Sequence, residues 1–141
     1  MFREALKRTE LPVCYNGTLF TCEDLKRFAE DFPEVDRVML GRGLIANPGL
    51  ADDFRTGSRP DKQKMKAMHD RILEQYLAQV SGAHNTIYKM KELWFYQIWM
   101  FADVKKYEKK IRKCQRLEEY REIVDALFRD CDLAEGAGFP G

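Results

Sequence analysis

In this 141-residue sequence, the residues whose types and spacing best suit the binding of an anion form two glycine-containing loops. Asn16-Gly17 follows the apolar run at residues 11–15, and Gly41-Arg42-Gly43 follows a second apolar run at residues 37–40. Glycine lets backbone amides approach an anion closely, and the N-terminus of a following helix adds partial positive charge. Arg42 adds a charge-assisted contact. Each loop taken alone is more often only a tight turn, but the pair predicts a phosphate-binding cup.

A second candidate site is a run of basic residues in the later part of the chain. Residues 85–116 hold nine basic and three acidic side chains, a local net charge of +6, whereas the whole chain has a formal net charge of +1. Fields act over roughly 8–10 Å at physiological salt, so the local excess matters more than the total. The pattern predicts a nucleic-acid-binding surface, with a solvated helix face as the alternative. The predicted RNA-binding residues are Lys89, Lys91, Lys105, Lys106, Lys109, Lys110, Arg112 and Lys113.

The composition and spacing of the remaining residues indicate neither a metal site nor a catalytic site. The four cysteines form no Cys-x-x-Cys pair and lie far from His69 and His84 in the sequence, so we expect free thiols, some of them buried, and no metal site. We assign no catalytic residue. A hydrophobic content of 45% and an aromatic content of 12% are typical of a globular protein. Without a long apolar run or a signal peptide, we expect a cytoplasmic protein that does not span a membrane.

The elements that would position the two loops change type near residue 60. Residues 11–15 and 37–40 are rich in strand formers. A helix between them should begin after Thr21, an N-cap with Asp24 three residues later, and should end at Pro33. Two strand–loop–helix units in series indicate a parallel α/β layout, whose ligands bind at the carboxyl ends of the strands. Residues 44–60 then predict two short helical turns broken at Pro48-Gly49.

Beyond residue 60 every pattern is helical. We predict helices over residues 61–80, 85–101, 104–114 and 117–131, packed as a small antiparallel bundle, and a frayed segment at 132–141. The fold class is therefore α/β plus all-α, with domains at 1–60 and 61–141. The predicted inward residues are Met65, Met68, Ile72, Leu73, Tyr76, Val80, Ile87, Met90, Leu93, Trp94, Ile98, Phe101, Val104, Ile111, Tyr120, Ile123, Val124, Leu127 and Phe128.

Residues 11–17 (Leu-Pro-Val-Cys-Tyr-Asn-Gly), a capped helix, and residues 36–48 (Asp-Arg-Val-Met-Leu-Gly-Arg-Gly-Leu-Ile-Ala-Asn-Pro) together resemble the closing segment of tRNA-dihydrouridine synthases. That family has P-V-I-x-N-G-D-I at the seventh strand of its barrel and V-M-I-G-R-G-x-x-x-N-P at the eighth. The helical part resembles the family's C-terminal tRNA-binding domain, whose long helix carries K-x-x-x-x-W/Y, here Lys89 to Trp94. The resemblance spans about residues 1–130.

The resemblance implies a fold and an activity. Residues 1–60 would be the last two βα units of a TIM-type flavin barrel, and residues 61–141 a helical tRNA-binding domain. The parent enzyme would be a flavoprotein oxidoreductase of tRNA processing that uses FMN and NADPH to reduce uridine to dihydrouridine. The implied cofactor-binding residues are Asn16, Gly17, Gly41 and Arg42, with Thr18 as a weaker candidate because it replaces the family's aspartate.

Departures from the family pattern limit what this chain should do alone. A (β/α)₈ barrel needs about 250 residues, and the N-x-G-C-P segment that carries the family's catalytic cysteine is missing, so Cys14 and Cys22 should not inherit its role. We expect the C-terminal half of such an enzyme, inactive alone, with weak or absent FMN binding. Open strand edges would favour dimerisation or strand exchange.

Two alternatives without catalysis also fit the sequence. One is a stand-alone helical RNA-binding module. The other is a protein-interaction bundle whose aromatic side chains face a partner, although large aromatic side chains more often lie in a core. The aromatic residues in question are Trp94, Tyr96, Trp99 and Tyr107.

Overall fold

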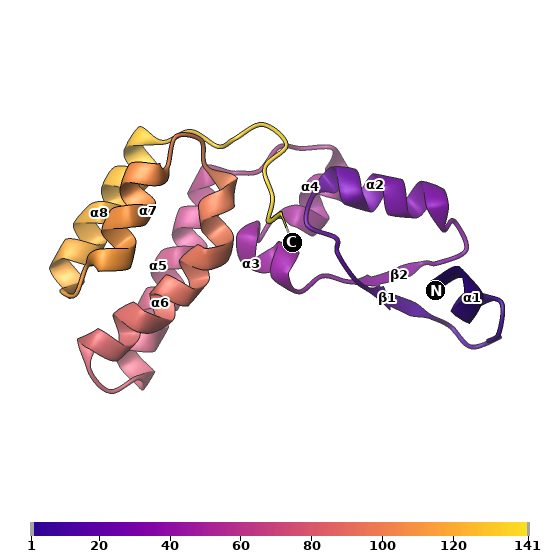
Figure 1. The fold of residues 1–141 in the computed structure, drawn as a ribbon, viewed down its shortest axis with the longest axis horizontal. Helices are drawn as coiled ribbons and strands as arrows, with labels where there is room; N and C mark the ends of the chain where they lie inside the picture. The colour runs from indigo at the N-terminus through magenta and orange to yellow at the C-terminus, as the bar shows by residue number, and fades with distance from the viewer. Residues whose placement is uncertain (1, 141) are drawn as a thin grey trace.

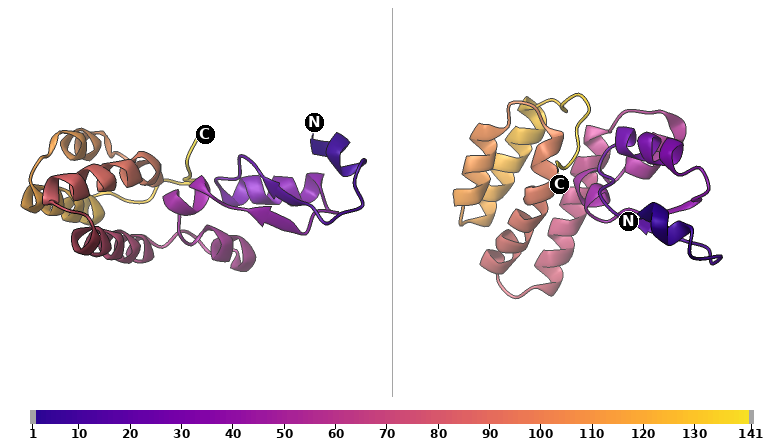
Figure 2. Two further views of the ribbon diagram at one scale, coloured as in Figure 1. Left: turned by 90° about the horizontal axis from the view of Figure 1, so that it is seen from below. Right: turned by 45° about the vertical axis from the view of Figure 1, so that its right-hand side comes forward.

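The computed structural model describes residues 2–140 as a small α/β part followed by a helical part (Figure 1). Two further views show the strands and α2 towards one end of the molecule and the helices α5 to α8 at the other (Figure 2). The elements, in chain order, are α1 (Phe2–Leu6), β1 (Cys14–Asn16), α2 (Cys22–Asp31), β2 (Arg37–Met39), α3 (Arg42–Ala46), α4 (Leu50–Thr56), α5 (Lys62–Gln79), α6 (Ala83–Gln97), the 3₁₀ helix η1 (Ile98–Met100), α7 (Lys105–Lys113) and α8 (Leu117–Asp130).

The two strands pair in parallel, as the sequence predicts. Tyr15 lies opposite Val38, and Asn16 lies opposite Met39. β1 begins at Cys14, later than the predicted start at residue 11, because Pro12 has no N–H to donate to a ladder. Within residues 2–140 the sheet has two strands, so each keeps an open edge. Dimerisation or strand exchange through these edges stays a prediction.

α2 begins with the predicted capping box. Thr21 Oγ1 accepts a hydrogen bond from the Asp24 amide at 3.0 Å, and Asp24 Oδ2 accepts one from the Thr21 amide at 2.9 Å. The same carboxylate oxygen also accepts from the Phe20 amide at 3.0 Å. Asp24 therefore holds both the first turn of α2 and the loop that precedes it.

One face of the sheet packs on α2. The ring of Tyr15 stacks on Phe28 with 4.3 Å between centroids, and Leu19, Leu25 and Leu50 complete a small core. Strand side chains alternate between faces, so Cys14 and Asn16 point away from this core, and both are exposed. At β1 the side of Tyr15 is thus covered and the other side is open to solvent, whereas all three residues of β2 are exposed.

The break between α3 and α4 falls at Pro48-Gly49, which confirms the prediction. Buried Asn47 closes the turn, because its Nδ2 donates to Asp53 Oδ2 at 2.9 Å and its Oδ1 accepts from the Gly49 amide at 3.0 Å. The Asn-Pro motif therefore acts locally, by holding α4 at a defined angle to α3.

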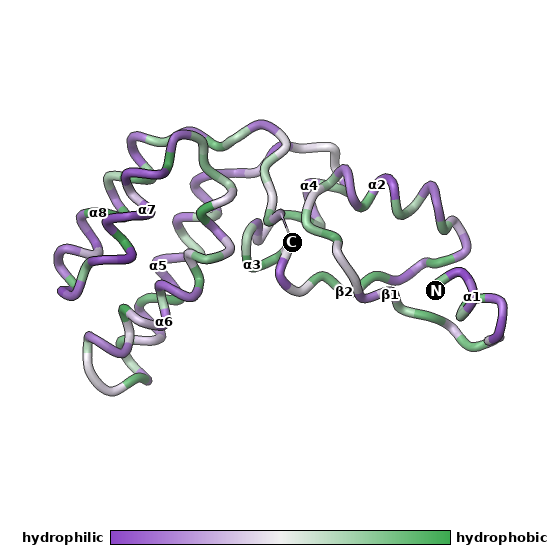
Figure 3. Tube along the Cα trace, viewed as in Figure 1, coloured by the Kyte–Doolittle hydropathy of each residue, from purple (hydrophilic) through white to green (hydrophobic). Residues whose placement is uncertain are grey.

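The helices α5 to α8 share one apolar core. Most predicted inward residues are buried, among them Met65, Met90, Trp94, Tyr120 and Leu127. Hydrophobic and hydrophilic stretches alternate along these helices in Figure 3, as expected for helices with one inward face. The predicted helix over 85–101 ends earlier, at Gln97, because the chain tightens into η1.

Burial also tests the hypothesis that four aromatic side chains face a partner. Trp94 and Tyr107 are buried in the helical core, so the hypothesis is wrong for these two. Tyr96 is half-buried and packs against the same core, whereas Trp99 is 51% exposed. Of the four, only Trp99 presents most of its ring to solvent.

A polar cluster lies inside the helical core, centred on His69, for which the local sequence predicts no role. His69 is 1% exposed, and its Nε2 lies 2.7 Å from the Tyr120 hydroxyl. The indole N–H of Trp94 donates to the same hydroxyl at 2.8 Å. His69 Nδ1 lies 3.0 Å from Asp70 Oδ1. Burial lowers the pKa of His69, although the neighbouring Asp70 acts in the opposite direction.

The prediction that residues 132–141 are frayed is wrong for the described part, which ends at residue 140. The Ala134 amide donates to the Met100 carbonyl at 2.9 Å, and Leu133 forms a β-bridge with Phe101. Phe139 is buried against Phe20 and Tyr96. Local sequence gave no periodic signal here, because distant elements supply the contacts that order the segment. Its end lies beside α3 in Figure 1.

No helix within residues 2–140 combines the length and the apolar character needed to cross a bilayer.

Candidate functional site

The two glycine-containing loops lie side by side at the carboxyl ends of the strands. The pairing of Asn16 with Met39 brings both strands to the same edge, and each loop leaves from there. Gly43 fits directly onto the first loop, because a Cβ at this position would lie 2.6 Å from the carbonyl oxygen of Leu19. The contact between the loops is therefore made by Gly43 with Leu19, and the predicted residues Asn16, Gly17, Thr18, Gly41 and Arg42 lie in the two segments that meet there.

The two helices that follow these loops differ in how open their N-termini are to an anion. Asp24 places a carboxylate at the N-terminus of α2, where it accepts from the Phe20 and Thr21 amides. α3 has neither an acidic residue in its first turn nor a side-chain cap, and a Cβ at Gly41 would meet nothing within 4 Å. The first amides of a helix have no partner inside the helix. The N-terminus of α3 is therefore uncapped and open, whereas a carboxylate occupies that of α2.

Arg42 lies beside aromatic rings from distant parts of the sequence. Its guanidinium carbon lies 5.0 Å from the ring centroid of Phe20 and 5.9 Å from that of Phe139. A guanidinium that stacks on a ring keeps N–H donors in its own plane. Phe20 follows the first loop and Phe139 belongs to the C-terminal segment, so three distant parts of the chain meet at this side chain.

The residues of the first loop have different surroundings. Asn16 and Thr18 are exposed, and Gly17 is half-buried. A Cβ at Gly17 would collide with the ring and hydroxyl of Tyr15, so any larger residue here would displace the Tyr15 side chain. The tight-turn interpretation therefore explains Gly17, whereas the open space at Gly41 has no such explanation.

α7 presents its basic residues to solvent. Tyr107 and Ile111 face the core, as predicted for Ile111. Within residues 2–140, no acidic side chain forms an ion pair with a basic residue of α7. The exposed basic residues, here called the α7 basic face, are Lys105, Lys106, Lys109, Lys110, Arg112 and Lys113.

The two predicted RNA-binding lysines of α6 have protein partners. Lys91 Nζ donates to the carbonyl oxygens of Cys114 at 2.7 Å and Arg112 at 3.1 Å, so it caps the C-terminus of α7. Lys89 Nζ lies 3.3 Å from Glu92 Oε2. Lys91 therefore fastens α7 to α6, a role that sequence spacing does not reveal.

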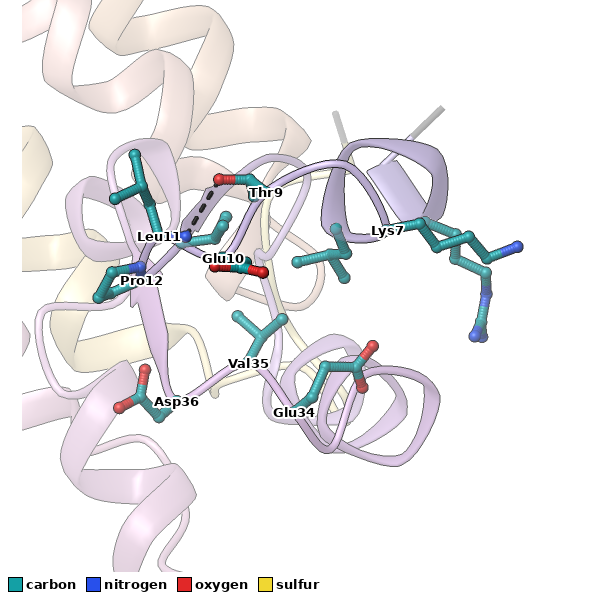
Figure 4. Close-up of a pocket in the computed structure, with 11 residues that line it drawn as sticks. Lys7, Thr9, Glu10, Leu11, Pro12, Glu34, Val35 and Asp36 are labelled. Carbon is teal, nitrogen blue, oxygen red and sulfur yellow. Dashed lines mark hydrogen bonds between the residues drawn. The ribbon is translucent and has the colours of Figure 1, made fainter.

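A pocket of about 500 Å³ lies at the opposite ends of the strands (Figure 4). It is bordered by the segments that lead into β1 and β2, including Thr9, Pro12, Val35 and Asp36. Its charged side chains have both signs, Lys7 and Glu34 among them. The pocket is therefore separate from the paired loops and has no dominant charge for an anion.

The cysteines show no arrangement for metal binding in the described part of the chain. Cys114 and Cys131 are buried and act as small apolar core residues, which confirms the expectation that some thiols are buried. Cys14 is exposed on the open face of the sheet. Among residues 2–140 there is no group of three His, Cys, Asp or Glu side chains placed to hold a metal ion.

Comparison with known proteins identifies a family and two relatives. The family model described as dihydrouridine synthase (Dus) matches residues 2–132. Over 57 residues the chain is 39% identical to the tRNA-dihydrouridine(16) synthase of Shewanella oneidensis, and the aligned segment covers 40% of this chain and 18% of that protein. Over 67 residues it is 36% identical to the tRNA-dihydrouridine(16) synthase of Aquipseudomonas alcaligenes, and the aligned segment covers 45% of this chain and 21% of that protein. The match therefore spans about a fifth of each relative. Since the family model covers most of its length, the chain belongs to the dihydrouridine synthase family.

Proposed function

We propose that this chain supplies the cofactor-phosphate loops and the tRNA-binding helices of a tRNA-dihydrouridine synthase. Such an enzyme reduces uridine in tRNA to dihydrouridine, with FMN as cofactor and NADPH as reductant. The observation that carries the proposal is the pair of loops at Asn16-Gly17 and Gly41-Arg42, which lie side by side in a chain of this family. Loops after the last two strands and the N-terminus of a short extra helix form the phosphate site of many (β/α)₈ barrels.

The residues present fit a phosphate group. Gly41 has open space where a side chain would be, and the first turn of α3 holds no acid that would repel an anion. The amides of α3 and the guanidinium of Arg42 would hold the FMN phosphate, and the first loop would contact it through Asn16, Gly17 and Thr18. When bound, FMN supplies the hydride-transfer chemistry, while the protein supplies binding and orientation.

The chain's own part in the reaction would be positioning. Phe20 and Phe139 hold the Arg42 guanidinium beside the loops, which reduces the entropy lost when it binds a phosphate. Residues 1–141 contain no N-x-G-C-P segment, and the two strands described within residues 2–140 are too few to enclose a flavin ring. We therefore expect a colourless preparation that does not oxidise NADPH when it is given flavin and unmodified tRNA.

The helical part would bind tRNA. We propose that α5 to α8 form an antiparallel bundle, because short connections join α5 to α6 and α7 to α8, the helices of each pair pack together, and α8 also packs on α6. The α7 basic face would contact the phosphate backbone, since folded RNA is recognised largely through shape and phosphates. Like charges this close repel one another by about 0.2–0.5 kcal/mol per i,i+4 pair, so an anionic partner would relieve the strain.

A charge-matched pair of variants tests tRNA binding. Replacing Lys105, Lys109 and Lys113 with alanine should weaken binding of unmodified tRNA and flatten its salt dependence, whose slope is about −0.7 to −0.9 per neutralised phosphate. The control variant replaces three exposed lysines elsewhere, Lys7, Lys26 and Lys64, and removes the same charge. Equal tRNA affinities for the two variants, measured across a salt series, would contradict the proposal.

A further inference from the structure

Three large aromatic side chains are exposed along one face of α6 and η1. The exposed fraction is 63% for Tyr88, 62% for Phe95 and 51% for Trp99. They are seven and four residues apart, so they share one helical face. Most of each ring lies in solvent, although burial of such rings is normally favourable. This aromatic row is unexplained by the packing of the helical core.

Beside this row a groove of about 340 Å³ runs between α6–η1 and α7. Its apolar walls include Phe95, Trp99 and Ile111, and its polar groups are those of Lys91, Glu108 and Arg112. Ligand pockets generally have volumes of about 300–1,000 Å³, so the groove has room for a nucleotide base. We call the groove and the exposed rings of Phe95 and Trp99 the aromatic groove.

The aromatic groove lies between the two parts of the proposed site. On one side, Phe95 is 5.7 Å from Phe139 between ring centroids, and Phe139 is 5.9 Å from the guanidinium carbon of Arg42. On the other side, Arg112 both lines the groove and belongs to the α7 basic face. An RNA strand bound on α7 would therefore pass over the groove on its way to the cofactor-phosphate loops.

We propose that the aromatic groove stacks unpaired bases of the RNA whose backbone is held by the α7 basic face. This inference rests on the proposed function, because it takes tRNA as the partner of α7. Aromatic faces stack any base, and basic residues at the rim bind the phosphates that connect the bases. The charge around the groove favours this partner, since residues 85–116 hold nine basic and three acidic residues. Glu108 disfavours a phosphate inside the groove, so the bases enter it and the phosphates lie on the rim at Arg112.

The test compares single-stranded with duplex RNA on the full chain. Phe95→Ala together with Trp99→Ala should weaken binding of a ten-nucleotide oligouridylate by about tenfold or more, because stacking contributes about 1–3 kcal/mol per base. Binding of a blunt RNA duplex of equal length should stay unchanged. The conservative pair Phe95→Tyr and Trp99→Phe keeps the rings and should bind the oligouridylate like the parent protein. Both pairs change exposed residues, and circular dichroism checks that helix content is retained.

The outcomes separate this inference from the proposed function. If the parent chain binds both RNAs and the alanine pair binds the oligouridylate equally well, the stacking groove is wrong and tRNA binding by α7 stands. If the parent chain binds neither RNA, both proposals are wrong. If the parent chain elutes as a dimer and the alanine pair as a monomer, the groove joins two copies of this chain and the stacking proposal is overturned.

Discussion

His69 Nε2 and the hydroxyl oxygen of Tyr120 lie 2.7 Å apart inside the helical core, although 51 residues separate them in the chain. The Trp94 N–H donates to the same oxygen at 2.8 Å. Burial favours a neutral imidazole, and the ionised Asp70 carboxylate beside Nδ1 can only accept, so we assign the hydroxyl as the donor to Nε2. The imidazole proton then belongs on Nδ1, which donates to Asp70 at 3.0 Å. This chain of hydrogen bonds joins α5, α6 and α8 with every donor matched to an acceptor.

Replacing Tyr120 with phenylalanine should destabilise the protein by about 2 kcal/mol or more. The change leaves the Trp94 N–H and His69 Nε2 buried without a partner, and each such group costs about 1–3 kcal/mol. Urea unfolding measures the loss. Tyr88→Phe is the matched control, because Tyr88 is 63% exposed and the same hydroxyl removal should change little. A similar small change for both variants would mean that the buried network contributes nothing to stability.

Stability should decrease as the pH falls below about 6.5, the ordinary pKa of histidine. Burial lowers the pKa of His69, so the unfolded chain binds a proton that the folded protein does not bind. The charged groups that face His69 are Asp70, Lys66 and Asp125, and the proximity of Asp70 limits the shift. Each bound proton contributes a slope of up to about 1.4 kcal/mol per pH unit.

Two histidine variants test whether His69 causes this decrease in stability at low pH. His69→Gln should flatten the decline in unfolding free energy between pH 7.5 and 5, because glutamine does not titrate. His84→Gln should retain the decline, since His84 is exposed. Unfolding free energies from urea titrations at several pH values decide the matter, and a decline that survives in His69→Gln would assign it to other groups.

Alanine should have opposite consequences at two nearby glycines. At Gly43 a Cβ would lie 2.6 Å from the Leu19 carbonyl oxygen and 2.9 Å from a methyl carbon of Leu50, so we expect a loss of about 1–3 kcal/mol. At Gly41 a Cβ would meet nothing within 4 Å, and stability should change by less than about 0.5 kcal/mol. Thermal unfolding of both variants measures the difference. Equal stability of the two would show that the loops are not in direct contact.

Gln97 should be replaceable by methionine with a gain in stability of about 1 kcal/mol. Its side chain is fully buried, and neither Nε2 nor Oε1 has a hydrogen-bond partner within residues 2–140. An apolar side chain of similar length removes both unpaired groups and keeps the volume. Gln79→Met, at an exposed position, controls for the change in helix composition. A melting temperature that falls in Gln97→Met would indicate that the amide has a polar partner.

Much of the secondary structure was determined by the sequence alone. The capping box at Thr21 and Asp24, the break at Pro48 and the apolar spacing along α8 each depend on residues within a few positions of one another. Such local interactions are visible in sequence because helices are stabilised over three or four residues. The sequence also predicted the parallel pairing of β1 and β2, since two successive strands joined by a helix usually lie side by side in parallel.

Only the tertiary structure decided which polar side chains form hydrogen bonds between helices and whether the C-terminal segment is ordered. No local pattern predicts the structural roles of His69 and Lys91, because their partners Tyr120 and Cys114 are distant in the sequence. Phe139 lies in a segment of glycine and proline that local sequence would leave frayed, yet Phe20 and Tyr96 bury it. The physical reason is the same in each case. The free energy of burying a polar group or ordering a terminus depends on partners that only the folded chain brings within contact distance.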